Sequence, residues 1–347
     1  MKAIVIPRHG EPEVFEEKQL PEPELKPTEV LIEVEAAGVN FADIMGRMGL
    51  YPDAPKLPFA PGYEVAGRIL QTGSEVKTVQ KGEAVFALTP FWGYADHVKT
   101  DYRFVYKLPS FLNLEQAAAI PVNFLTAYLT LFDMGQARQG ERVLILMGAG
   151  GVGTAAVQMA REQGLEIFAT CGSPEKVEFL RKLGVQHPIN YQAQDYLEIV
   201  REKTNGKGVD LILDPVTGSA LRKHIKLLAP LGRIVVYGAS SLVTNKKRNI
   251  ISAAKEMMML PFIHPVTLMQ KNIGILGVNL GHLWHLPQRC GHAMEEILQG
   301  MEKGKFKPIL SEKFPLTPQG AAQAHHYIQN RKNMGKVLLT RSQSVKN

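Results

Sequence analysis

The stretch RVLILMGAGGVG at residues 142–153 decides the fold, because it joins an apolar run to a glycine-rich turn. The residues that follow, TAAVQMAREQG, have the apolar spacing of an amphipathic helix. The turn has the G-x-G-x-x-G spacing in the required strand–turn–helix context. Glycines there let the backbone approach a pyrophosphate, and the helix N-terminus supplies amide donors. The turn therefore predicts dinucleotide binding, whereas the alternative is a tight turn in a nucleotide-free α/β protein. The predicted contacts are Gly150, Gly151, Val152 and Gly153.

Strand-like and helix-like segments alternate along the chain around this turn. Parallel strands joined by right-handed crossovers give such alternation, so the prediction is an α/β fold with a doubly wound parallel sheet. Strands are expected at Arg142–Met147, Glu166–Cys171, His187–Asn190, Leu211–Asp214, Arg233–Tyr237 and Ile273–Val278. Helices are expected at Thr154–Gln163, Pro174–Leu183, Asp195–Thr204 and Ser219–Leu228.

The first third of the chain is instead rich in β signals, such as the alternating VLIEV at Val30–Val34. We expect a small, mostly β domain there, to which the C-terminal segments return. The predicted boundaries are 1–122 together with 285–347 for this discontinuous domain, and 123–284 for the parallel sheet. Further strands are expected at Ala3–Ile6, Val65–Gln71, Glu83–Leu88, Tyr94–Val98 and Gly335–Leu339, and helices at Glu115–Ile120, Phe124–Phe132, Pro287–Glu302 and Pro318–Gln329.

Charge is distributed unevenly over the 347 residues. The chain has 40 Lys+Arg and 33 Asp+Glu, and residues 215–347 hold 19 of the basic but only 5 of the acidic side chains. Such a basic half can serve a nucleic acid, an anionic membrane or a phosphorylated cofactor. The longest basic run is Lys246-Lys247-Arg248, and there is no zinc-finger spacing, so nucleic acid is not expected as a partner. The two cysteines, Cys171 and Cys290, cannot form a disulfide framework.

Two apolar segments bear on targeting and on membrane insertion. The apolar stretch of Met1–Pro7 is too short for a secretion signal. Met257–Ile263 is interrupted by Pro261 and is too short to span a membrane. The expectation is a soluble protein of the cytoplasm.

The residues after the second predicted strand bear on the choice between NADH and NADPH. An NAD site usually carries Asp or Glu about 20 residues beyond the glycines. This chain has Cys171-Gly172-Ser173-Pro174-Glu175-Lys176 instead. Ser173 and Lys176 offer a donor and a positive charge for a 2′-phosphate, so NADPH is the expected cofactor. The alternative for Lys176 is a solvated lysine in the first turn of a helix.

Several segments together resemble the zinc-free quinone oxidoreductase group of the medium-chain dehydrogenase/reductase superfamily. They are Ala36–Asp43 (AAGVNFAD), Gly49–Pro52 (GLYP), Leu57–Glu64 (LPFAPGYE), Gly148–Gly153 and Gly335–Leu339 (GKVLL). Val122–Tyr128, His187–Tyr191, Asp214-Pro215 and Lys247–Asn249 resemble the vesicle amine transport protein branch. The resemblance implies a GroES-like catalytic domain plus a Rossmann domain. It also implies a homodimer in which the strand around Ile273–Val278 pairs with its copy.

The same resemblance bears on metal chemistry. Zinc-dependent members carry Cys where this chain has Asn40, and His in a Gly-His-Glu motif that here is Gly62-Tyr63-Glu64. Asn and Tyr are poor zinc ligands beside thiolate and imidazole, so no metal is expected.

Without a metal, hydride acceptance must need only modest polarisation of the acceptor oxygen. A quinone or an α,β-unsaturated carbonyl fits, because conjugation spreads the developing negative charge. Tyr51 matches a tyrosine of related enoyl reductases and is expected to donate a proton or stabilise the enolate; the alternative is a loop tyrosine that packs under the site. Asn40 is expected to orient the nicotinamide or the substrate carbonyl, and Asp43 to cap the helix after it. The remaining cofactor contacts implied are Thr126, Tyr191, Gly238, Ala239, Asn279, Arg331 and Asn333.

An alternative function is a membrane- or lipid-associated protein that binds NADPH as a structural ligand. It draws on Thr244–Arg248 and on the Met-rich segment Met257–Phe262. Met-rich helices more often form adaptable core or a substrate wall, so peripheral membrane contact is not favoured.

Overall fold

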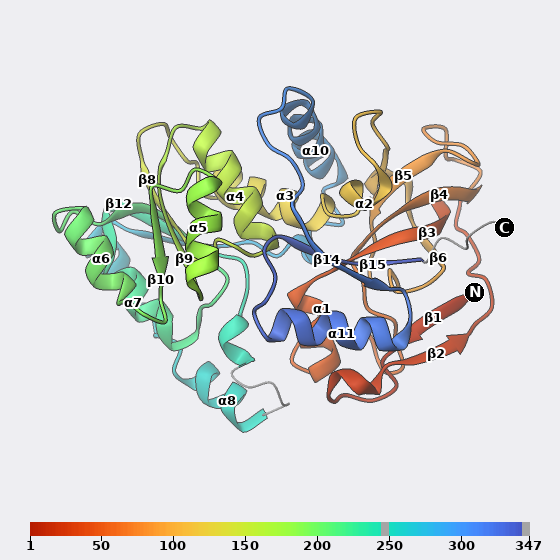
Figure 1. The fold of residues 1–347 in the computed structure, drawn as a ribbon, viewed down its shortest axis with the longest axis horizontal. Coiled ribbons are helices and arrows are strands. Elements are labelled where there is room, and N and C mark those ends of the chain that lie inside the picture. The colour runs from red at the N-terminus through yellow and green to blue at the C-terminus, as the bar shows by residue number, and fades with distance from the viewer. Residues whose placement is uncertain (244–249, 342–347) are drawn as a thin grey trace.

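The computed structural model describes residues 1–243 and 250–341. The basic segment Thr244–Arg248 and the motif Lys247–Asn249 therefore lie outside the described residues. Two sheets organise the chain, and Figure 1 shows them as the two halves of the molecule.

The first sheet has six strands in the order β10-β9-β8-β11-β12-β13, and all its pairings are parallel. In chain order this is the doubly wound 3-2-1-4-5-6 arrangement, so the predicted Rossmann sheet is confirmed. The order reverses between β8 and β11, which places the glycine-rich turn after β8 at the switch point. The strands are β8 Arg142–Ile145, β9 Glu166–Cys171, β10 His187–Asn190, β11 Val209–Asp214, β12 Leu228–Val236 and β13 Gly274–Gly277.

Both faces of this sheet are buried, which explains its near-continuous apolar strands. Val143 and Ile145 of β8 belong to one core cluster, together with Leu180, whereas Leu144 lies in a second cluster on the opposite face with Val200. The helices that follow the strands supply the cover. They are α4 Gly151–Glu162, α5 Pro174–Lys182, α6 Tyr196–Lys203 and α7 Leu221–Ile225.

The predicted helix Ser219–Leu228 is wrong at both ends. A 3-10 turn, η4 (Gly218–Ala220), precedes α7, and β12 already begins at Leu228. Leu228 pairs with Val209 of β11, and the amide of Val209 donates to the carbonyl of Leu227 at 2.8 Å. The end of the predicted helix is therefore replaced by strand pairing, which begins at Leu228.

The second sheet has seven strands, of which six follow the order β14-β15-β3-β4-β5-β7, while β6 pairs with β3. The last strand of the chain, β15, is antiparallel to β3, with Leu338 opposite Gly38. The C-terminal strand thus pairs with a strand from the first third of the chain, as predicted. The domain boundaries at residues 122 and 285 stay a prediction. The strands are β3 Glu29–Val39, β4 Glu64–Thr72, β5 Ala84–Leu88, β6 His97–Asp101, β7 Val105–Lys107, β14 Leu310–Pro315 and β15 Lys336–Thr340; β1 Lys2–Val5 and β2 Glu16–Gln19 form a separate ribbon.

The predicted strand Tyr94–Val98 is displaced in the structure. Its first residues contact β1 instead: Ala95 bridges Ala3, and the amide of Ile4 donates to the carbonyl of Tyr94 at 2.8 Å. The ladder with β3 starts only at His97. The alternation of the sequence continues through both pairings, so it could not reveal where one ends.

The remaining helices join or flank the two halves. α1 (Phe41–Met48) and α11 (Pro318–Gln329) lie beside each other in Figure 1, and α10 (Pro287–Glu302) lies at the opposite edge. The predicted helix Phe124–Phe132 spans α3 (Pro121–Tyr128) and a π-helical turn, η3 (Leu129–Asp133). Also present are α2 (Leu114–Ala117), α8 (Ile250–Met258) and α9 (Pro265–Lys271).

α8 projects away from both sheets in Figure 1. Large apolar side chains on α8, on α9 and between them are exposed, among them Met258 at 87% and Phe262 at 89% of their surface. Within the described residues, no helix is long and apolar enough to cross a membrane.

Candidate active site

The glycine-rich turn connects β8 to α4, and its glycines are required to different degrees. A Cβ on Gly153 would lie 2.5 Å from the carbonyl oxygen of Met147, which no side chain tolerates. A Cβ on Gly150 would meet only that same oxygen, at 3.3 Å. Gly151 lies against the side-chain amide of Asn123. The N-terminus of α4 begins at Gly151, three residues before the predicted start, so its free amides face the turn.

The last strand of the chain enters beside this turn. The amide of Gly335 donates to the carbonyl of Ala149 at 2.9 Å, and Gly150 and Gly335 form a parallel bridge. The Asn333 side chain donates to the carbonyl of Gly335 at 3.2 Å. Two segments about 185 residues apart in the chain are therefore joined at the predicted cofactor site.

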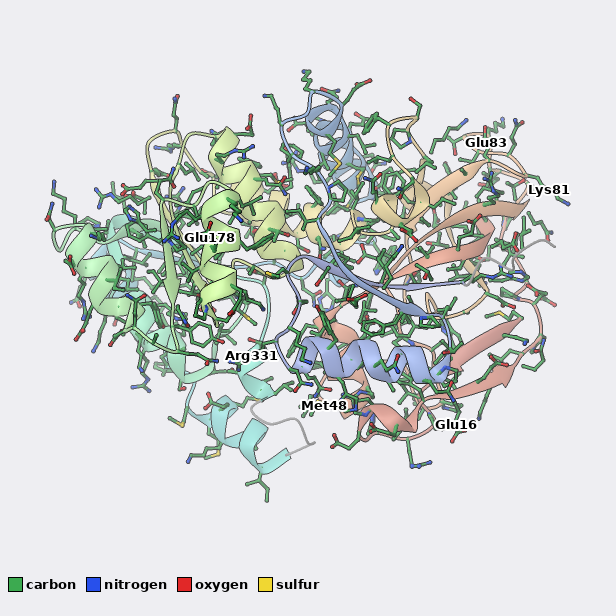
Figure 2. The ribbon with its side chains drawn as sticks, viewed as in Figure 1. Glu16, Met48, Lys81, Glu83, Glu178 and Arg331 are labelled. Atoms are coloured by element: carbon green, nitrogen blue, oxygen red, sulfur yellow. The ribbon has the colours of Figure 1, made fainter. Side chains whose placement is uncertain are left out.

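A positively charged cluster lies at the carboxyl ends of β9 and β10. The Lys176 ammonium donates to the carbonyl of Arg331 at 2.6 Å, and Arg331 donates to the hydroxyl of Tyr191 at 2.6 Å. Ser173 caps α5 by accepting from the amide of Lys176 at 3.4 Å. Burial, followed by the neighbouring charge of Arg331, lowers the pKa of Lys176. Figure 2 shows Arg331 where the chain leaves α11 toward the parallel sheet.

This cluster brings together Ser173 and Lys176, which were predicted at the 2′-phosphate, with Tyr191 and Arg331, which the family resemblance implied as cofactor contacts. Two cations beside a phenol form a suitable setting for a phosphate group. Glu175 is exposed on the first turn of α5, where its carboxylate interacts with Ser173. The end of β9 itself carries no carboxylate.

The other predicted cofactor residues have different surroundings. Thr126 is buried on α3, and Gly238 follows β12, where a Cβ would lie 2.9 Å from the carbonyl oxygen of Pro215. Ala239 comes directly before the 3-10 turn η5 (Ser240–Leu242). Asn279 contacts the loop that carries Tyr51, through Asp53.

Tyr51 is half-buried between two loops. Its ring packs edge-on against Tyr63, with centroids 6.2 Å apart. From the other side, a Cβ on Gly281 would lie 3.6 Å from the Tyr51 hydroxyl. Asn279 donates to Asp53 at 3.2 Å, and His282 lies 2.9 Å from the same carboxylate. Burial, and then the charge of Asp53, raises the pKa of Tyr51, so its hydroxyl remains a proton donor at neutral pH.

Asn40 lies in a buried network with two charged residues. Its side-chain amide donates to Glu64 Oε1 at 3.0 Å, and its Oδ1 accepts from the ammonium of Lys336 at 2.6 Å. Lys336 and Glu64 also form a direct ion pair, and both are almost completely buried. The backbone amide of Asn40 donates to Asp43 Oδ2 at 2.7 Å, so Asp43 caps α1 as predicted.

A second set of hydrogen bonds continues from Asp43 into the interior. Asp43 accepts from the amide of Gly62 at 2.9 Å and from the hydroxyl of Tyr94 at 3.2 Å. Tyr94 lies 3.4 Å from the imidazole of His325. Burial raises the pKa of Asp43 to about 7, although its backbone donors favour the carboxylate.

Sequence reasoning did not single out Glu64 or Lys336 as site residues. Both had a usable signal, because each is a charged residue next to an apolar strand that is otherwise buried: GYEVAG for Glu64 and GKVLL for Lys336. Charged residues are seldom fully buried unless they are paired, so two such positions suggest a pair. Their separation in the chain hid which residue was the partner.

The residues at the zinc-ligand positions of related proteins do not fit a zinc ion. Asn40 and Tyr63 offer an amide and a phenol, and the Lys336 ammonium already contacts Asn40 and Glu64. A cation placed there would be repelled by that ammonium. In the described part of the chain, no group of three His, Cys, Asp or Glu side chains is placed to hold a metal.

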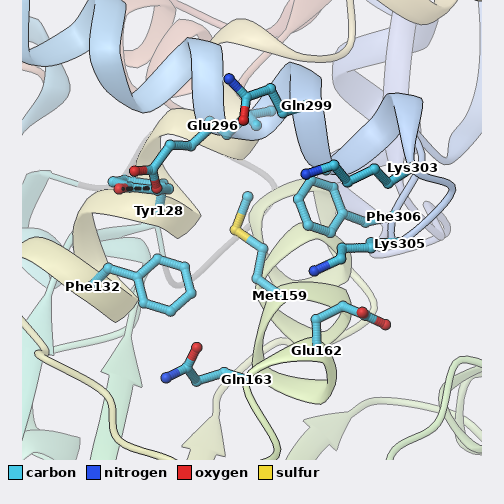
Figure 3. A pocket seen from close by; sticks show the side chains of 12 residues that line it. Tyr128, Phe132, Met159, Glu162, Gln163, Glu296, Gln299, Lys303, Lys305 and Phe306 are labelled. Carbon is cyan, nitrogen blue, oxygen red and sulfur yellow. Dashed lines mark hydrogen bonds between the residues drawn. The ribbon is translucent and has the colours of Figure 1, made fainter.

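A pocket of about 320 Å³ lies elsewhere, between α3, α4 and α10. Figure 3 shows Tyr128 bonded to Glu296, at 2.6 Å, beside Phe132 and Met159. None of its lining residues was predicted for the cofactor or the substrate.

A Rossmann sheet with a glycine-rich turn, combined with a second sheet that supplies polar side chains beside it, defines a dinucleotide-type dehydrogenase or reductase fold. Residues 26–111 match the alcohol dehydrogenase GroES-like domain family, and residues 151–299 match the zinc-binding dehydrogenase family.

Individual proteins agree with these families. The synaptic vesicle membrane protein VAT-1 homolog of Danio rerio is 37% identical over 92% of this chain, which spans 65% of that relative. The quinone oxidoreductase of Rattus norvegicus is 33% identical, with 98% of this chain and 97% of the relative covered. The crystal structure of Escherichia coli quinone oxidoreductase complexed with NADPH has a TM-score of 0.86 at 27% identity, with 98% of this chain and 100% of that chain covered.

The chain belongs to the medium-chain dehydrogenase/reductase superfamily of oxidoreductases, in the quinone oxidoreductase group near the VAT-1 branch. The family resemblance inferred from the sequence and the GroES-like plus Rossmann architecture are confirmed.

Proposed function

We propose that this protein is an NADPH-dependent oxidoreductase that transfers a hydride to a quinone or an α,β-unsaturated carbonyl without zinc. The observation that carries the proposal is the cluster of Lys176, Arg331 and Tyr191 at the end of β9, where an NAD enzyme has a carboxylate. The NADPH complex of the Escherichia coli relative supports the same cofactor.

The residues present would hold different parts of a dinucleotide. The turn at Gly150–Gly153 would hold the pyrophosphate, and Ser173, Lys176, Tyr191 and Arg331 the adenosine end with its 2′-phosphate. Bound NADPH would supply the hydride. The other proposed contacts are Asn40, Thr126, Gly238, Ala239, Asn279 and Asn333.

Two residues of the second sheet's half would act on the substrate side. Tyr51 is a protonated phenol, so it can donate a hydrogen bond or a proton to the substrate oxygen as negative charge develops there. Asn40 would orient the nicotinamide or the substrate carbonyl. An acceptor whose developing charge is delocalised needs no metal ion. The Lys336 ammonium beside Asn40 and Glu64 would also repel a zinc ion.

The test is NADPH oxidation, followed at 340 nm with a panel of quinones and enones, and compared with NADH. We expect turnover with at least one conjugated acceptor and a clear preference for NADPH. Absence of turnover with every acceptor, together with no NADPH binding by calorimetry, would refute the proposal.

We also propose a homodimer that pairs β13 with its copy. β13 is an edge strand of the six-stranded sheet, and exposed edge strands are natural pairing surfaces. Light scattering during size-exclusion chromatography distinguishes a dimer from a monomer.

The alternative function, membrane or lipid association with NADPH as a structural ligand, is supported by one observation. Exposed apolar side chains gather on and around α8 and α9: Ile251, Met257, Met258, Phe262, Val266 and Met269. Flotation with anionic liposomes at two salt concentrations tests it. Binding without any reductase activity would favour this alternative. Nucleic acid is not proposed as a partner, and a salt-dependent mobility shift would contradict that expectation.

A further inference from the structure

The buried ion pair between Glu64 and Lys336 performs no step of the proposed reaction, yet it lies directly behind Asn40. Glu64 is 0% and Lys336 3% exposed. Burying two charges costs free energy unless both are well paired and hydrogen-bonded. Both conditions are met, since Glu64 also accepts from the amide of Val122 at 2.8 Å, and Lys336 also donates to Asn40.

The pair constrains the side chain of Asn40. An asparagine carboxamide can rotate by 180° with almost no change of shape, which exchanges its donor and its acceptor. Here Lys336 donates to Oδ1 while Glu64 accepts from Nδ2. In the rotated orientation the ammonium would face an amide donor and the carboxylate would face an oxygen. Both contacts would become repulsive, so only one orientation is stable.

The same pair connects the segments that form the proposed cofactor site. Lys336 directly follows Gly335, whose amide donates to Ala149 in the glycine-rich turn. Val122, which donates to Glu64, is followed by Asn123, whose side-chain amide lies against Gly151. The orientation of Asn40 is therefore set by the elements that also place the turn.

We propose that Lys336 and Glu64 are positioning residues that hold the Asn40 carboxamide in one orientation beside the nicotinamide end of the cofactor, where the long 3.5 Å contact of its Nδ2 with the carbonyl of Gly38 is the one that a ligand would replace. This inference rests on the proposed function. Lys336 acts through Asn40, so removal of Lys336 must have no effect on ligand binding once Asn40 is gone.

The experiment is a double-mutant cycle on ligand affinity, measured by calorimetry. The variants are Asn40→Ala, Lys336→Met, the two combined, and Lys336→Arg as the conservative control. The ligands are NADPH and adenosine 2′,5′-bisphosphate, which has the phosphorylated adenosine end but no nicotinamide. Circular dichroism verifies that each variant is folded.

We expect Lys336→Met to weaken NADPH binding by about 10-fold, because the disordered Asn40 carboxamide loses about one hydrogen bond to the ligand. The affinity for adenosine 2′,5′-bisphosphate should stay within about 2-fold of wild type, because Lys336 does not act on that end. The combined variant should bind NADPH as Asn40→Ala does, and Lys336→Arg should restore most of the affinity.

Additive losses in the cycle, or equal losses for both ligands, would overturn the inference, because a pair that only supports the fold gives that result. If Lys336→Met does not fold, the cycle is repeated with Glu64→Gln. Failure of both to fold would show that the pair serves folding alone. A wild-type protein that binds no NADPH would instead refute the proposed function.

Discussion

The guanidinium of Arg47 donates to the imidazole of His325, Nε to Nδ1 at 3.2 Å, and both side chains are completely buried between α1 and α11. Since Nδ1 accepts, a neutral His325 carries its proton on Nε2, which faces the hydroxyl of Tyr94 at 3.4 Å. Tyr94 in turn donates to Asp43. All donors in this chain of contacts therefore point toward the carboxyl group that holds the backbone of Asn40.

The first prediction concerns stability at acid pH. Burial, and then the charge of Arg47, lowers the pKa of His325 well below its usual value, so the folded protein keeps His325 neutral while the unfolded chain protonates near pH 6.5. The contribution of His325 to the free energy of unfolding is present above pH 6.5. It is lost as the pH falls, by up to about 1.4 kcal/mol per pH unit. Urea unfolding from pH 7 to 5 should show a flatter dependence for His325→Gln than for wild type. Parallel curves would contradict the prediction.

Asp43 should have the opposite effect on the pH dependence of stability. Burial raises its pKa to about 7, so the folded protein holds a proton that the unfolded chain releases near pH 4. Stability from this group is highest at acid pH and is lost as the pH rises toward 7. Relative to Asp43→Asn, wild type should therefore lose unfolding free energy between about pH 4 and pH 7. A constant difference would show that Asp43 does not titrate in this range.

Replacement of Tyr51 by Phe should separate catalysis from cofactor binding. Tyr51→Phe keeps the ring on Tyr63 but removes the proton donor, so we expect kcat to fall by about 10- to 100-fold, with NADPH affinity unchanged.

Tyr63→Phe is the matched control for Tyr51→Phe. The Tyr63 hydroxyl is buried and interacts with the hydroxyl of Tyr51. Tyr63→Phe removes this neighbour but leaves the proposed proton donor in place, so kcat should fall far less than in Tyr51→Phe. An unchanged kcat in Tyr51→Phe would assign Tyr51 to packing alone, with the reaction relying on cofactor placement.

The positive cluster predicts a selective loss of cofactor affinity. Lys176→Ala should weaken NADPH binding by about 10-fold and NADH binding much less, because only NADPH has the 2′-phosphate. Lys182→Ala is the control, since Lys182 lies on the same helix with its side chain 77% exposed. Calorimetric titration of both cofactors measures the difference, and equal losses would remove the 2′-phosphate assignment.

Two glycine substitutions test the geometry of the turn. Gly153→Ala places a Cβ 2.5 Å from the carbonyl oxygen of Met147 and should destabilise the protein by about 1–3 kcal/mol. Gly291→Ala in α10 meets nothing within 4 Å and should stabilise it by about 0.5–1 kcal/mol. Thermal unfolding compares the two, and a stable Gly153→Ala would contradict the observed packing of the turn.

The Rossmann half could be predicted from the sequence because its signals are local. Apolar runs mark strands that are buried on both faces, and the glycine spacing marks the turn at the switch point. The errors at residues 94–98 and 219–228 arose where pairing with a distant strand, at Ala3 and Val209, overrode the local pattern.

The candidate site was less predictable, for a related reason. Lys336 reaches Asn40 across 296 positions of the chain, and Arg47 reaches His325 across 278. No local periodicity encodes such pairs. Family resemblance supplied Asn40 and Tyr51, but it did not reveal the buried charges that hold Asn40.

The position of β15 also restricts how the molecule can move. This strand is hydrogen-bonded into the sheet of β3, while Gly335, directly before it, is bonded to the glycine-rich turn of the other sheet. The two halves are thus joined by main-chain bonds close to the candidate site, in addition to side-chain contacts between them such as Lys176 with Arg331 and Asn279 with Asp53. If the halves open to admit a ligand while the bonds beside the glycine-rich turn are kept, the displacement is smallest at that turn and largest at the far ends of the two sheets.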